Sequence, residues 1–491
     1  MTRVRPAIER MTGIDAGFLY METPSVHMHT LKIAILEADE ALTYDGFVAA
    51  MLHRLKRLPP LRRRAVPVPF GLNHPVWVTL ARIDAGHHFR RHRLQGDGTM
   101  RELEQLIGLV ASTPLDRSYP LWELHFCEGL EGGRVAVVGK MHHAMADGAA
   151  ANALLANVTD VRSAVAPEPL QEECESTTRL PSKAMLVRHA LRDATAQIAC
   201  IPGLLARTGK GLVGALKERR GGVKTPMPVF HAPRVSFNGS LTSRRTFATV
   251  TLPLADFRRI RAQYDGATLN DLVLAVTSGA LRRWLVAHGE QPSSSLLAGV
   301  PISADGKDAL PRLAGNRVSN LFTTLATDVD DPVERVRKIS ETTAQSKRIQ
   351  QRLGTSILAD WSQFTPPRPF AFLVRAYSRI SAASWHSAAF SAIVSNVPGP
   401  REPAAVGGAR LVDLYSVGPL VDGIGLNVTV WSYVDRMNFS LLACPELLPD
   451  VHRLAAYFPE ALAELDLERK AKPEHRTQPA HGREAGRQAR A

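Results

Sequence analysis

Short apolar runs and helical spacings alternate along the first third of the chain. Leu31 to Leu36 is mostly apolar, which indicates a buried strand, and residues 134 to 141 predict a second one. The second strand leads directly into a polar run at residues 142 to 148. Three helices are predicted around these strands: from the spacing of Phe47, Met51, Leu55 and Leu58 behind a Thr43 cap, from that of Leu103, Leu106, Ile107 and Val110, and over Ala149 to Val158.

A long basic segment separates this part from a second set of strands and helices. Between Lys183 and Arg220 apolar residues recur at helical spacing, and the polar positions are almost all basic. We expect this helical segment to break at Pro202-Gly203, because proline lacks the backbone donor that a helix needs. Val165 to Thr178 is polar and contains two prolines, which predicts a surface loop. Beyond the basic segment, strands are predicted over residues 246–252, 389–395 and 425–433, and a helix over residues 270–285.

The length of the chain favours two domains. At 491 residues it exceeds one ordinary core and suits two α/β domains of about 200 residues each. We place the N-terminal domain at residues 1–165, a linker with basic amphipathic helices at 166–235, and the C-terminal domain at 236–468. Residues 469–491 have no apolar side chain larger than alanine and predict a disordered basic tail.

Composition narrows the partners and the compartment. The formal net charge of +13 predicts affinity for anions such as acidic phospholipid, nucleic acid or a phosphorylated co-substrate. Four cysteines lie far apart without a CxxC pair, which argues against zinc or disulfides and favours the reducing cytoplasm. The sequence shows no secretory signal and no apolar run of about 18 residues, so no membrane-spanning helix is expected. No nucleic-acid recognition motif is present and aromatic residues make up only 6%, so a nucleic-acid partner is not expected.

The run His142-His143-Ala144-Met145-Ala146-Asp147-Gly148 holds the candidate chemistry. Histidine titrates near neutral pH, so His143 can take a proton from an alcohol, whose own pKa lies far above 7. General-base help of this kind is worth about 100- to 10,000-fold in rate. Where the alcohol attacks a coenzyme A thioester, the thiolate leaves readily, so neither a protein nucleophile nor a metal is required.

Asp147 and Gly148 are expected to hold the loop that carries this histidine and to shape the site. Glycine permits a sharp or left-handed turn, and Asp147 could cap the following helix or pair with a buried arginine. A metal site of His142, His143 and Asp147 is less favoured, because neighbouring residues on a strand point to opposite faces. Two adjacent histidines also arise by chance in a chain with 17, so their place between a strand and a helix carries the argument.

Further motifs follow in order from about residue 12 to residue 450. They are Ile14–Tyr20 with Glu22-Thr23-Pro24 and Met28-His29, Pro114–Arg117 with Pro120–Glu123, Thr268–Asp271, Gly315-Asn316 with Ser319-Asn320, Ser395–Pro400, and Gly425–Val428 with Ser432-Tyr433. HHxxxDG alone is common to a larger group that includes chloramphenicol acetyltransferase and peptide-synthetase condensation domains. The whole set resembles the wax ester synthase/diacylglycerol acyltransferases of bacteria.

The resemblance implies both a fold and an activity. The implied fold is α/β (α+β), with two chloramphenicol-acetyltransferase-like domains, mixed sheets flanked by helices and a channel between the domains. Acyl-CoA would enter one mouth of the channel as co-substrate, with no further cofactor, and diacylglycerol or a long-chain alcohol would enter the other. His143 would be the general base of an O-acyltransferase that makes triacylglycerol or wax esters, with His142 and Asp147 as supporting groups.

Each of the other motifs fits a structural role as well as a functional role. Pro120-Leu121-Trp122 fits a core or the substrate channel, and Asn270-Asp271 fits a helix cap or a group that orients the site. Residues 395–400 have the composition of a turn and would shape a crossover near the channel. Asn427 lies on a predicted strand and fits either a structural role or an oxyanion-type donor.

The sequence leaves several alternatives open. Lys183 to Arg220 could lie on the inner face of the plasma membrane or on a lipid droplet, or pack on the protein as a linker. The donor could be a carrier-protein thioester, or the acceptor a non-lipid group, and a basic binding protein is the remaining alternative. Asp305 stands where the family often has an arginine, which leaves ligand contacts near Ser303 open.

Overall fold

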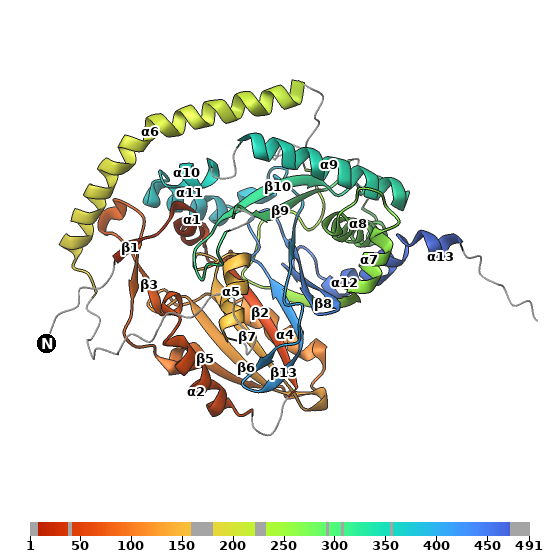
Figure 1. The fold of residues 1–491 in the computed structure, drawn as a ribbon, viewed down its shortest axis with the longest axis horizontal. Coiled ribbons are helices and arrows are strands. Elements are labelled where there is room, and N and C mark those ends of the chain that lie inside the picture. Colours follow the sequence, from red (N-terminus) through yellow and green to blue (C-terminus); the bar gives the residue numbers. More distant parts are fainter. Residues whose placement is uncertain are drawn as a thin grey trace, which may run out of the picture.

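Two six-stranded sheets with helices around them form the body of the molecule (Figure 1). The computed structural model describes residues 8–37, 42–158, 180–220, 232–290, 294–305, 309–353 and 357–471. The predicted loop Val165 to Thr178 lies outside the described residues. So does most of the predicted basic tail, of which residues 469–471 belong to helix α13 (Leu467–Ala471).

The first sheet carries the strand that leads into the His-His motif. Its strands are β2 (His29–Glu37), β5 (Phe89–Arg93), β6 (Trp122–Leu130), β7 (Arg134–His142), β12 (Ala405–Val406) and β13 (Ala409–Val417). They lie in the order β12-β13-β2-β7-β6-β5, and all neighbours are antiparallel except β5 and β6. The predicted strands at residues 31–36 and 134–141 are confirmed as β2 and β7, which pair with each other along their whole length.

The second sheet is mixed. Its strands are β8 (Thr246–Pro253), β9 (Leu297–Ser303), β10 (Val318–Thr324), β11 (Ala392–Val397), β14 (Leu426–Tyr433) and β15 (Arg436–Ala443). They lie in the order β10-β9-β11-β14-β15-β8, with β9, β11 and β14 parallel and the outer pairs antiparallel. Three of these strands, β8, β11 and β14, confirm the predictions. A small third sheet contains β1 (Ile8–Arg10), β4 (Val76–Thr79) and β3 (Arg63–Val66).

The second half of the chain supplies an edge to the first sheet. β12 and β13 follow β11 in the chain, yet β13 pairs antiparallel with β2, from Leu411 opposite Leu36 to Val417 opposite Leu31. The chain then returns to the second sheet as β14. The predicted division into domains contained no such exchange, because an apolar run indicates a strand but not the strand it will pair with.

Helices cover the faces of the sheets and complete the cores. α2 (Tyr44–Leu55) and α5 (Gly148–Val158) pack on one face of the first sheet, and α4 (Met100–Ala111) packs on the other. α8 (Leu269–Ala287) confirms the helix predicted over residues 270–285 and forms the core of the second half, where Leu272, Val273, Val276, Ala280 and Trp284 are all buried. Thr43 caps α2 as predicted. The other helices are α1 (Gly13–Met21), α3 (Ala85–His88), α7 (Leu254–Arg261), α9 (Pro332–Leu353), α10 (Ile357–Ser362), α11 (Pro367–Arg379) and α12 (Val451–Ala463).

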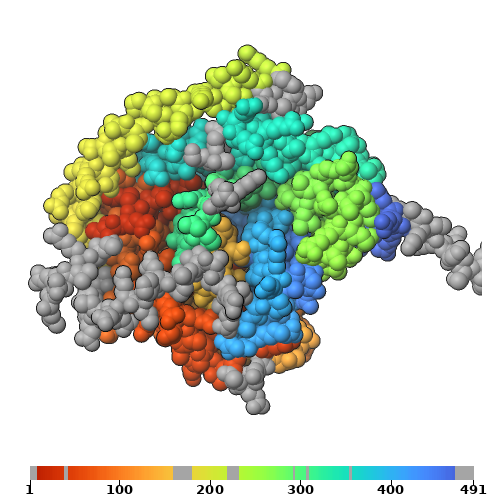
Figure 2. Space-filling view, viewed as in Figure 1, coloured from red at the N-terminus to blue at the C-terminus, as the bar shows by residue number. Residues whose placement is uncertain are grey.

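α6 (Lys183–Arg220) is one continuous helix, so the predicted break at Pro202-Gly203 is wrong. Tertiary contacts hold it on both sides of Pro202. Leu186 packs against the small sheet, and Arg207 pairs with Asp360 of α10 at 3.2 Å. Figure 1 shows α6 as an arch that passes over α10 and α11 towards α9, and Figure 2 shows it along the outer rim of the molecule. An exposed proline costs the helix one backbone hydrogen bond, while Leu186 before it and Leu204 after it are buried and hold both parts of the helix on the protein.

Candidate active site

His143 lies where the first sheet meets the second half of the chain. β7 ends at His142, and the backbone N–H of His143 donates to the carbonyl of Met28, 2.7 Å away. The imidazole stacks on the ring of Phe18 from α1, with 4.2 Å between ring centres and 19° between ring planes. His143 as a whole is half-buried, so it is held in place while part of it stays accessible.

A single asparagine fixes the tautomer of this imidazole. The side-chain nitrogen of Asn316 donates to Asp15 Oδ1 at 2.7 Å and to the carbonyl of His143 at 2.8 Å. The side-chain oxygen of Asn316 therefore faces His143 Nδ1, 3.0 Å away, and accepts its hydrogen. With Nδ1 protonated, the free electron pair of the neutral ring lies on Nε2.

Burial keeps the imidazole in its neutral form. It lowers the pKa of His143 to about 4, although the charge of Asp147 and the hydrogen bond with Asn316 act in the opposite direction. The neighbouring carboxyl of Asp15 shifts the other way, because burial raises its pKa to about 6 against the hydrogen bond from Asn316. A neutral ring with a fixed tautomer is the form of histidine that can accept a proton.

His142 points away from His143 into a buried polar cluster. Its Nδ1 accepts from the backbone N–H of Ala144 at 3.0 Å, so its Nε2 carries the hydrogen and lies 3.7 Å from Glu22 Oε1. His29 Nε2 lies 3.4 Å from the same oxygen, and Arg117 Nε donates to Glu22 Oε2 at 2.9 Å. Burial would raise the pKa of Glu22, but the two histidines and Arg117 outweigh it and hold that pKa below its usual range. The cluster therefore anchors the end of β7.

Asp147 fills both of the structural roles that the sequence left open. Its Oδ1 accepts from the backbone N–H of Ala150 at 3.0 Å and so caps α5. Its Oδ2 forms an ion pair with Arg312 and accepts from the backbone N–H of Arg317 at 2.8 Å. Asp305 also binds Arg312, at 3.1 Å. The aspartate that departs from the family pattern is thus part of the group that holds Asp147.

The segment around Gly315, in the second half of the chain, packs against the loop from His142 to Gly148. Gly315 forms a parallel bridge with Ala146, and its N–H donates to the carbonyl of Met145 at 2.7 Å. Its φ of +80° is a conformation that glycine adopts without strain. Gly148 has no such left-handed φ, because it is already the first residue of α5. A side-chain carbon added there would meet a methyl group of Val397 at 3.4 Å, an ordinary van der Waals distance, so the predicted need for a special backbone turn at Gly148 is not borne out.

The remaining predicted site residues lie in their own structural settings. Asp271 forms a capping box with Thr268 at the start of α8, and Asn270 lies in the same first turn. Asn427 on β14 donates to the carbonyl of Pro419 at 3.0 Å and accepts from Thr429 at 2.8 Å. None of these side chains lines the cavities beside the motif loop. Direct roles for Asn270, Asp271 and Asn427 stay predictions.

Trp122, from the proline-leucine-tryptophan motif, has the first of its two predicted settings, the core; a role in the substrate channel stays a prediction. It is buried in the core of the first half, and its Nε1 donates to the carbonyl of Leu61 at 2.7 Å. It also lines a mainly apolar cavity of about 140 Å³ beneath α5.

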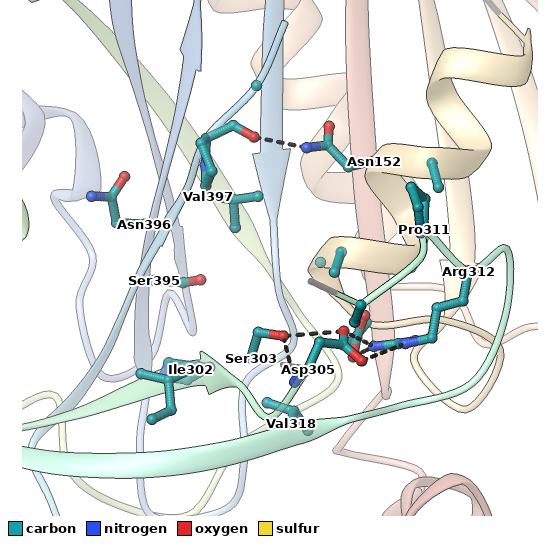
Figure 3. A pocket seen from close by; sticks show the side chains of 18 of the residues that line it. Asn152, Ile302, Ser303, Asp305, Pro311, Arg312, Val318, Ser395, Asn396 and Val397 are labelled. Carbon is teal, nitrogen blue, oxygen red and sulfur yellow. Dashed lines mark hydrogen bonds and ion pairs between the residues drawn. The ribbon is translucent and has the colours of Figure 1, made fainter. Parts of the chain in front are cut away.

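A larger cavity opens on the Asp147 side of the loop (Figure 3). Its volume is about 690 Å³, and its walls come from the start of α5, from the end of β9 with Asp305, and from residues 395–400, which include the end of β11. Asn152 of α5 donates to the carbonyl of Pro398 at 2.7 Å and ties the two halves together at its rim. The turn predicted over residues 395–400 is therefore partly wrong: Ser395 to Val397 belong to β11, and the crossover beside the cavity begins at Pro398.

A third cavity, which we name the α11 cavity, lies on the His143 side of the loop. Its volume is about 370 Å³. It is lined mainly by apolar side chains, among them Met21, Val26 and Met28 on one wall and the inner stripe of α11 on the other. Met28 is the residue whose carbonyl accepts the N–H of His143. Asp147 thus lines the 690 Å³ cavity directly, whereas His143 neighbours the α11 cavity through its backbone hydrogen bond with Met28.

Clusters of metal-binding side chains and membrane-spanning helices are both absent from the described residues. Within the ranges given above, no group of three or more His, Cys, Asp and Glu side chains is arranged to hold a metal ion. In the same ranges, no helix combines the length and the apolar character needed to cross a bilayer.

Several residues that build the site had no role assigned from sequence. Asp15, Phe18, Glu22 and Asn316 all belong to motifs that carried the family resemblance, which was the available signal. Their contacts with the histidines join positions far apart in the chain, as between Asn316 and Asp15. Arg312 belongs to none of those motifs, and only the expectation of an arginine partner for Asp147 pointed to it.

The chain is similar to proteins of one known family over most of its length. The catalytic-domain profile of the wax ester synthase/diacylglycerol acyltransferases matches residues 11–273, and the profile of their C-terminal domain matches residues 314–466. A provisionally named diacylglycerol O-acyltransferase of Mycobacterium tuberculosis is 38% identical over 91% of this chain and 94% of its own. The O-acyltransferase WSD of Acinetobacter baylyi is 31% identical over 91% of this chain and 95% of its own.

Solved structures confirm the predicted α/β fold with two chloramphenicol-acetyltransferase-like halves. The wax ester synthase/diacylglycerol acyltransferase of Marinobacter aquaeolei matches 94% of this chain and all of its own, with a TM-score of 0.65 and 25% identity. The starter condensation domain of rhizomide synthetase matches with a TM-score of 0.55 at 14% identity, which shows a common fold. The predicted class of enzyme, an O-acyltransferase, is confirmed with the family. The chain belongs to the wax ester synthase/diacylglycerol acyltransferase family.

Proposed function

We propose that the protein transfers a long-chain acyl group from acyl-CoA to the hydroxyl of diacylglycerol, and also to long-chain alcohols. The observation that supports this most strongly is the loop from His143 to Asp147. It carries a neutral histidine of fixed tautomer and adjoins a large cavity at one end and an apolar cavity at the other. Two substrates of different chemistry could then meet at Nε2. Relatives named as a diacylglycerol O-acyltransferase and as a wax ester synthase/diacylglycerol acyltransferase support the same acceptors.

In the proposed reaction, His143 Nε2 takes the proton of the acceptor hydroxyl as its oxygen attacks the thioester carbonyl. A carbon–oxygen bond forms, the carbon–sulfur bond breaks, and the imidazolium returns the proton to the leaving thiolate. The Asn316 hydrogen bond holds Nδ1 protonated throughout, so Nε2 is always the nitrogen that exchanges the proton. This chemistry needs no metal and no cofactor besides the co-substrate acyl-CoA.

The supporting roles follow from the contacts. His142 fixes the end of β7 through Glu22, while Asp147 and Gly148 hold the loop against the second half of the chain. We place the thioester arm of acyl-CoA in the 690 Å³ cavity at the start of α5, where serine and asparagine side chains can bind its amides. The apolar cavity beneath α5 is a suitable place for part of the acyl chain.

The acceptors are membrane lipids, so the proposal includes peripheral contact with an anionic membrane or a lipid droplet, from the cytoplasm. The net charge of +13 supports attraction to such a surface. The exposure of α6 fits both interpretations of this segment, a helix that binds the membrane and a linker that packs on the protein. It packs on the protein through Leu186, Leu204 and Ala215, and it exposes Ile198, Leu205 and Leu216 among basic residues.

Purified protein tested with radiolabelled palmitoyl-CoA should form triacylglycerol from diacylglycerol and wax ester from hexadecanol. Palmitoyl-CoA should be replaced in a parallel reaction by the same acyl group on a carrier protein, because the fold is also that of condensation domains. Product from the carrier thioester alone, or from amine acceptors alone, would contradict the proposal. Binding of nucleic acid that weakens with salt and is not accompanied by transfer would favour the alternative of a basic binding protein.

The acid limb of the pH–rate profile should lie well below pH 6.5. His143 loses its function as a base only when protonated, and its pKa is lowered to about 4, so kcat/KM should stay nearly constant from pH 8 towards pH 5. Initial rates after brief exposure to each pH, with return to pH 7 to exclude unfolding, would measure this.

Asp15 provides the matched control for that profile. Its pKa is raised to about 6, so a small inflection there should disappear in Asp15→Asn, whose amide can still accept from Asn316. A limb near pH 6.5 that persists in Asp15→Asn would show that the base titrates as an ordinary histidine, contrary to the buried and neutral state described here.

A further inference from the structure

α11 is an amphipathic helix whose apolar side packs on the edge of the first core through Phe370 and otherwise lines a cavity. Not one of its 13 residues is fully buried. Phe370, Val374 and Tyr377 recur at helical spacing, and all three line the α11 cavity. In a globular protein such a stripe ordinarily packs on a core. Here it roofs an open space beside the active-site loop.

The opposite side of α11 is exposed, aromatic and basic. Arg368, Phe372, Arg375 and Arg379 follow one another at intervals of four, three and four residues, so they form one outward stripe. Phe372 is 70% exposed. Among the residues that the structure describes, none of these three arginines takes part in an ion pair. Their charges are therefore available to a partner.

Neighbouring residues extend this stripe into a surface. Phe70, 71% exposed, lies next to the first turn of α11, with the guanidinium of Arg368 at 6.0 Å from its ring centre. Trp385, 68% exposed, follows a short 3₁₀ helix, η4 (Ala382–Ser384), that contacts α11. Residues 361–400 contain three arginines, seven aromatic residues and no aspartate or glutamate. We call Phe70, Trp385 and the outward stripe of α11 the α11 surface.

We propose that the α11 surface docks on an anionic phospholipid bilayer and that the α11 cavity beneath it passes the hydroxyl end of the lipid acceptor to His143. Arginines bind anionic headgroups, and exposed Phe and Trp side chains insert at the boundary between headgroups and acyl chains. The acceptor would then move from bilayer to cavity without exposing its apolar chains to water. This inference rests on the proposed transfer to a lipid alcohol.

The inner end of the cavity supports the route. Met28 lines it and accepts the N–H of His143 at 2.7 Å, while Thr23 on the same wall lies 3.2 Å from Ser378 of α11, hydroxyl to hydroxyl. Asp422 is the charged residue of the lining, and its Oδ1 accepts from the backbone N–H of Leu241 at 3.0 Å. The mouth of the cavity and the basic surface thus belong to one helix, whereas α6 exposes basic residues without lining this cavity.

Co-sedimentation with vesicles would test the docking surface. Full-length protein should bind vesicles of phosphatidylcholine with phosphatidylglycerol far better than vesicles of phosphatidylcholine alone. Each arginine near the surface contributes about fivefold to such binding, so the triple variant Arg368→Gln, Arg375→Gln, Arg379→Gln should weaken it by about 100-fold. The matched control is a variant of α6 that removes the same charge, Arg188→Gln, Arg192→Gln, Lys210→Gln. Its affinity for the vesicles should stay within about fivefold of that of the unmodified protein. Binding of the α11 variant at the unchanged level, or its loss only in the α6 variant, would overturn the proposal.

Activity separates this inference from the function on which it rests. The α11 variant should lose most transfer to diacylglycerol embedded in vesicles but keep transfer to a short, water-soluble alcohol within about twofold. Equal loss with both acceptors would refute a docking role for α11. If the unmodified protein transferred acyl groups to neither acceptor, the proposed function would fail, while the sedimentation result would still decide whether α11 binds lipid.

Discussion

Replacing His143 by alanine is expected to lower kcat/KM for acyl transfer by about 100- to 10,000-fold. The variant loses the Nε2 that accepts the proton in the proposed reaction, and His142 cannot replace it because its ring is directed into the Glu22 cluster. The fold should survive, since in the described part of the chain the side chain of His143 contributes one hydrogen bond, with Asn316, and stacking on Phe18. Single-turnover rates with palmitoyl-CoA and diacylglycerol would measure the loss.

Chemical rescue and a structural control make this result decisive. Added imidazole should restore part of the rate of His143→Ala, because the deleted ring leaves a space next to Phe18. Asn316→Ala keeps the base but frees its tautomer, so a smaller loss is expected. His142→Ala should affect stability and activity together, since it removes an anchor of β7. A well-folded His143→Ala protein with nearly full activity would refute the assignment of the general base.

Asp147→Ala should lower the free energy of unfolding by about 3–5 kcal/mol, mainly because it removes one of the two carboxylates that pair with half-buried Arg312. Loss of the α5 cap contributes about 1 kcal/mol of this. Asp305 remains beside Arg312, which favours the lower end of the range. Denaturant unfolding of the purified variant, followed by circular dichroism, would measure the change, and expression should fall with it.

Asp147→Asn separates the two roles of this side chain. The amide oxygen can still accept from Ala150 and cap α5, but the charge opposite Arg312 is gone. Its stability should therefore lie between those of the natural protein and Asp147→Ala. An Asp147→Ala protein that is fully stable and yet inactive would contradict the structural role and place Asp147 in the reaction itself.

Local pattern was sufficient for much of the fold. β2, β7, β8 and β14 were predictable because a short, buried apolar run is visible without knowledge of its partners. The placement of β13 beside β2 was not, since strand pairing depends on contacts between distant segments. α6 shows that a local preference can also mislead. Pro202 predicted a break in the helix, but tertiary contacts on both sides of this residue hold one continuous helix.

The site, like the fold, was predictable only in the part that is local in sequence. His142, His143 and Asp147 lie within six consecutive residues, so their spacing alone indicated a catalytic loop. The partners that orient them, Asn316 and Arg312, are supplied by the other half of the chain, and no spacing rule connects them with His143. Asp15 and Glu22 stood in recognised motifs, but only the geometry shows that one holds Asn316 and the other holds His142.

The exchange of β13 into the first sheet limits how this enzyme can admit its substrates. The backbone pairing of β13 with β2 connects the two halves of the chain. A hinge motion that separated the halves would have to break this pairing. Bulky lipids must then pass through ports that widen by small shifts of the segments at their rims. In an isolated N-terminal half, β2 would be an unpaired edge strand, which promotes aggregation. The N-terminal half therefore depends on β13 from the second half of the chain.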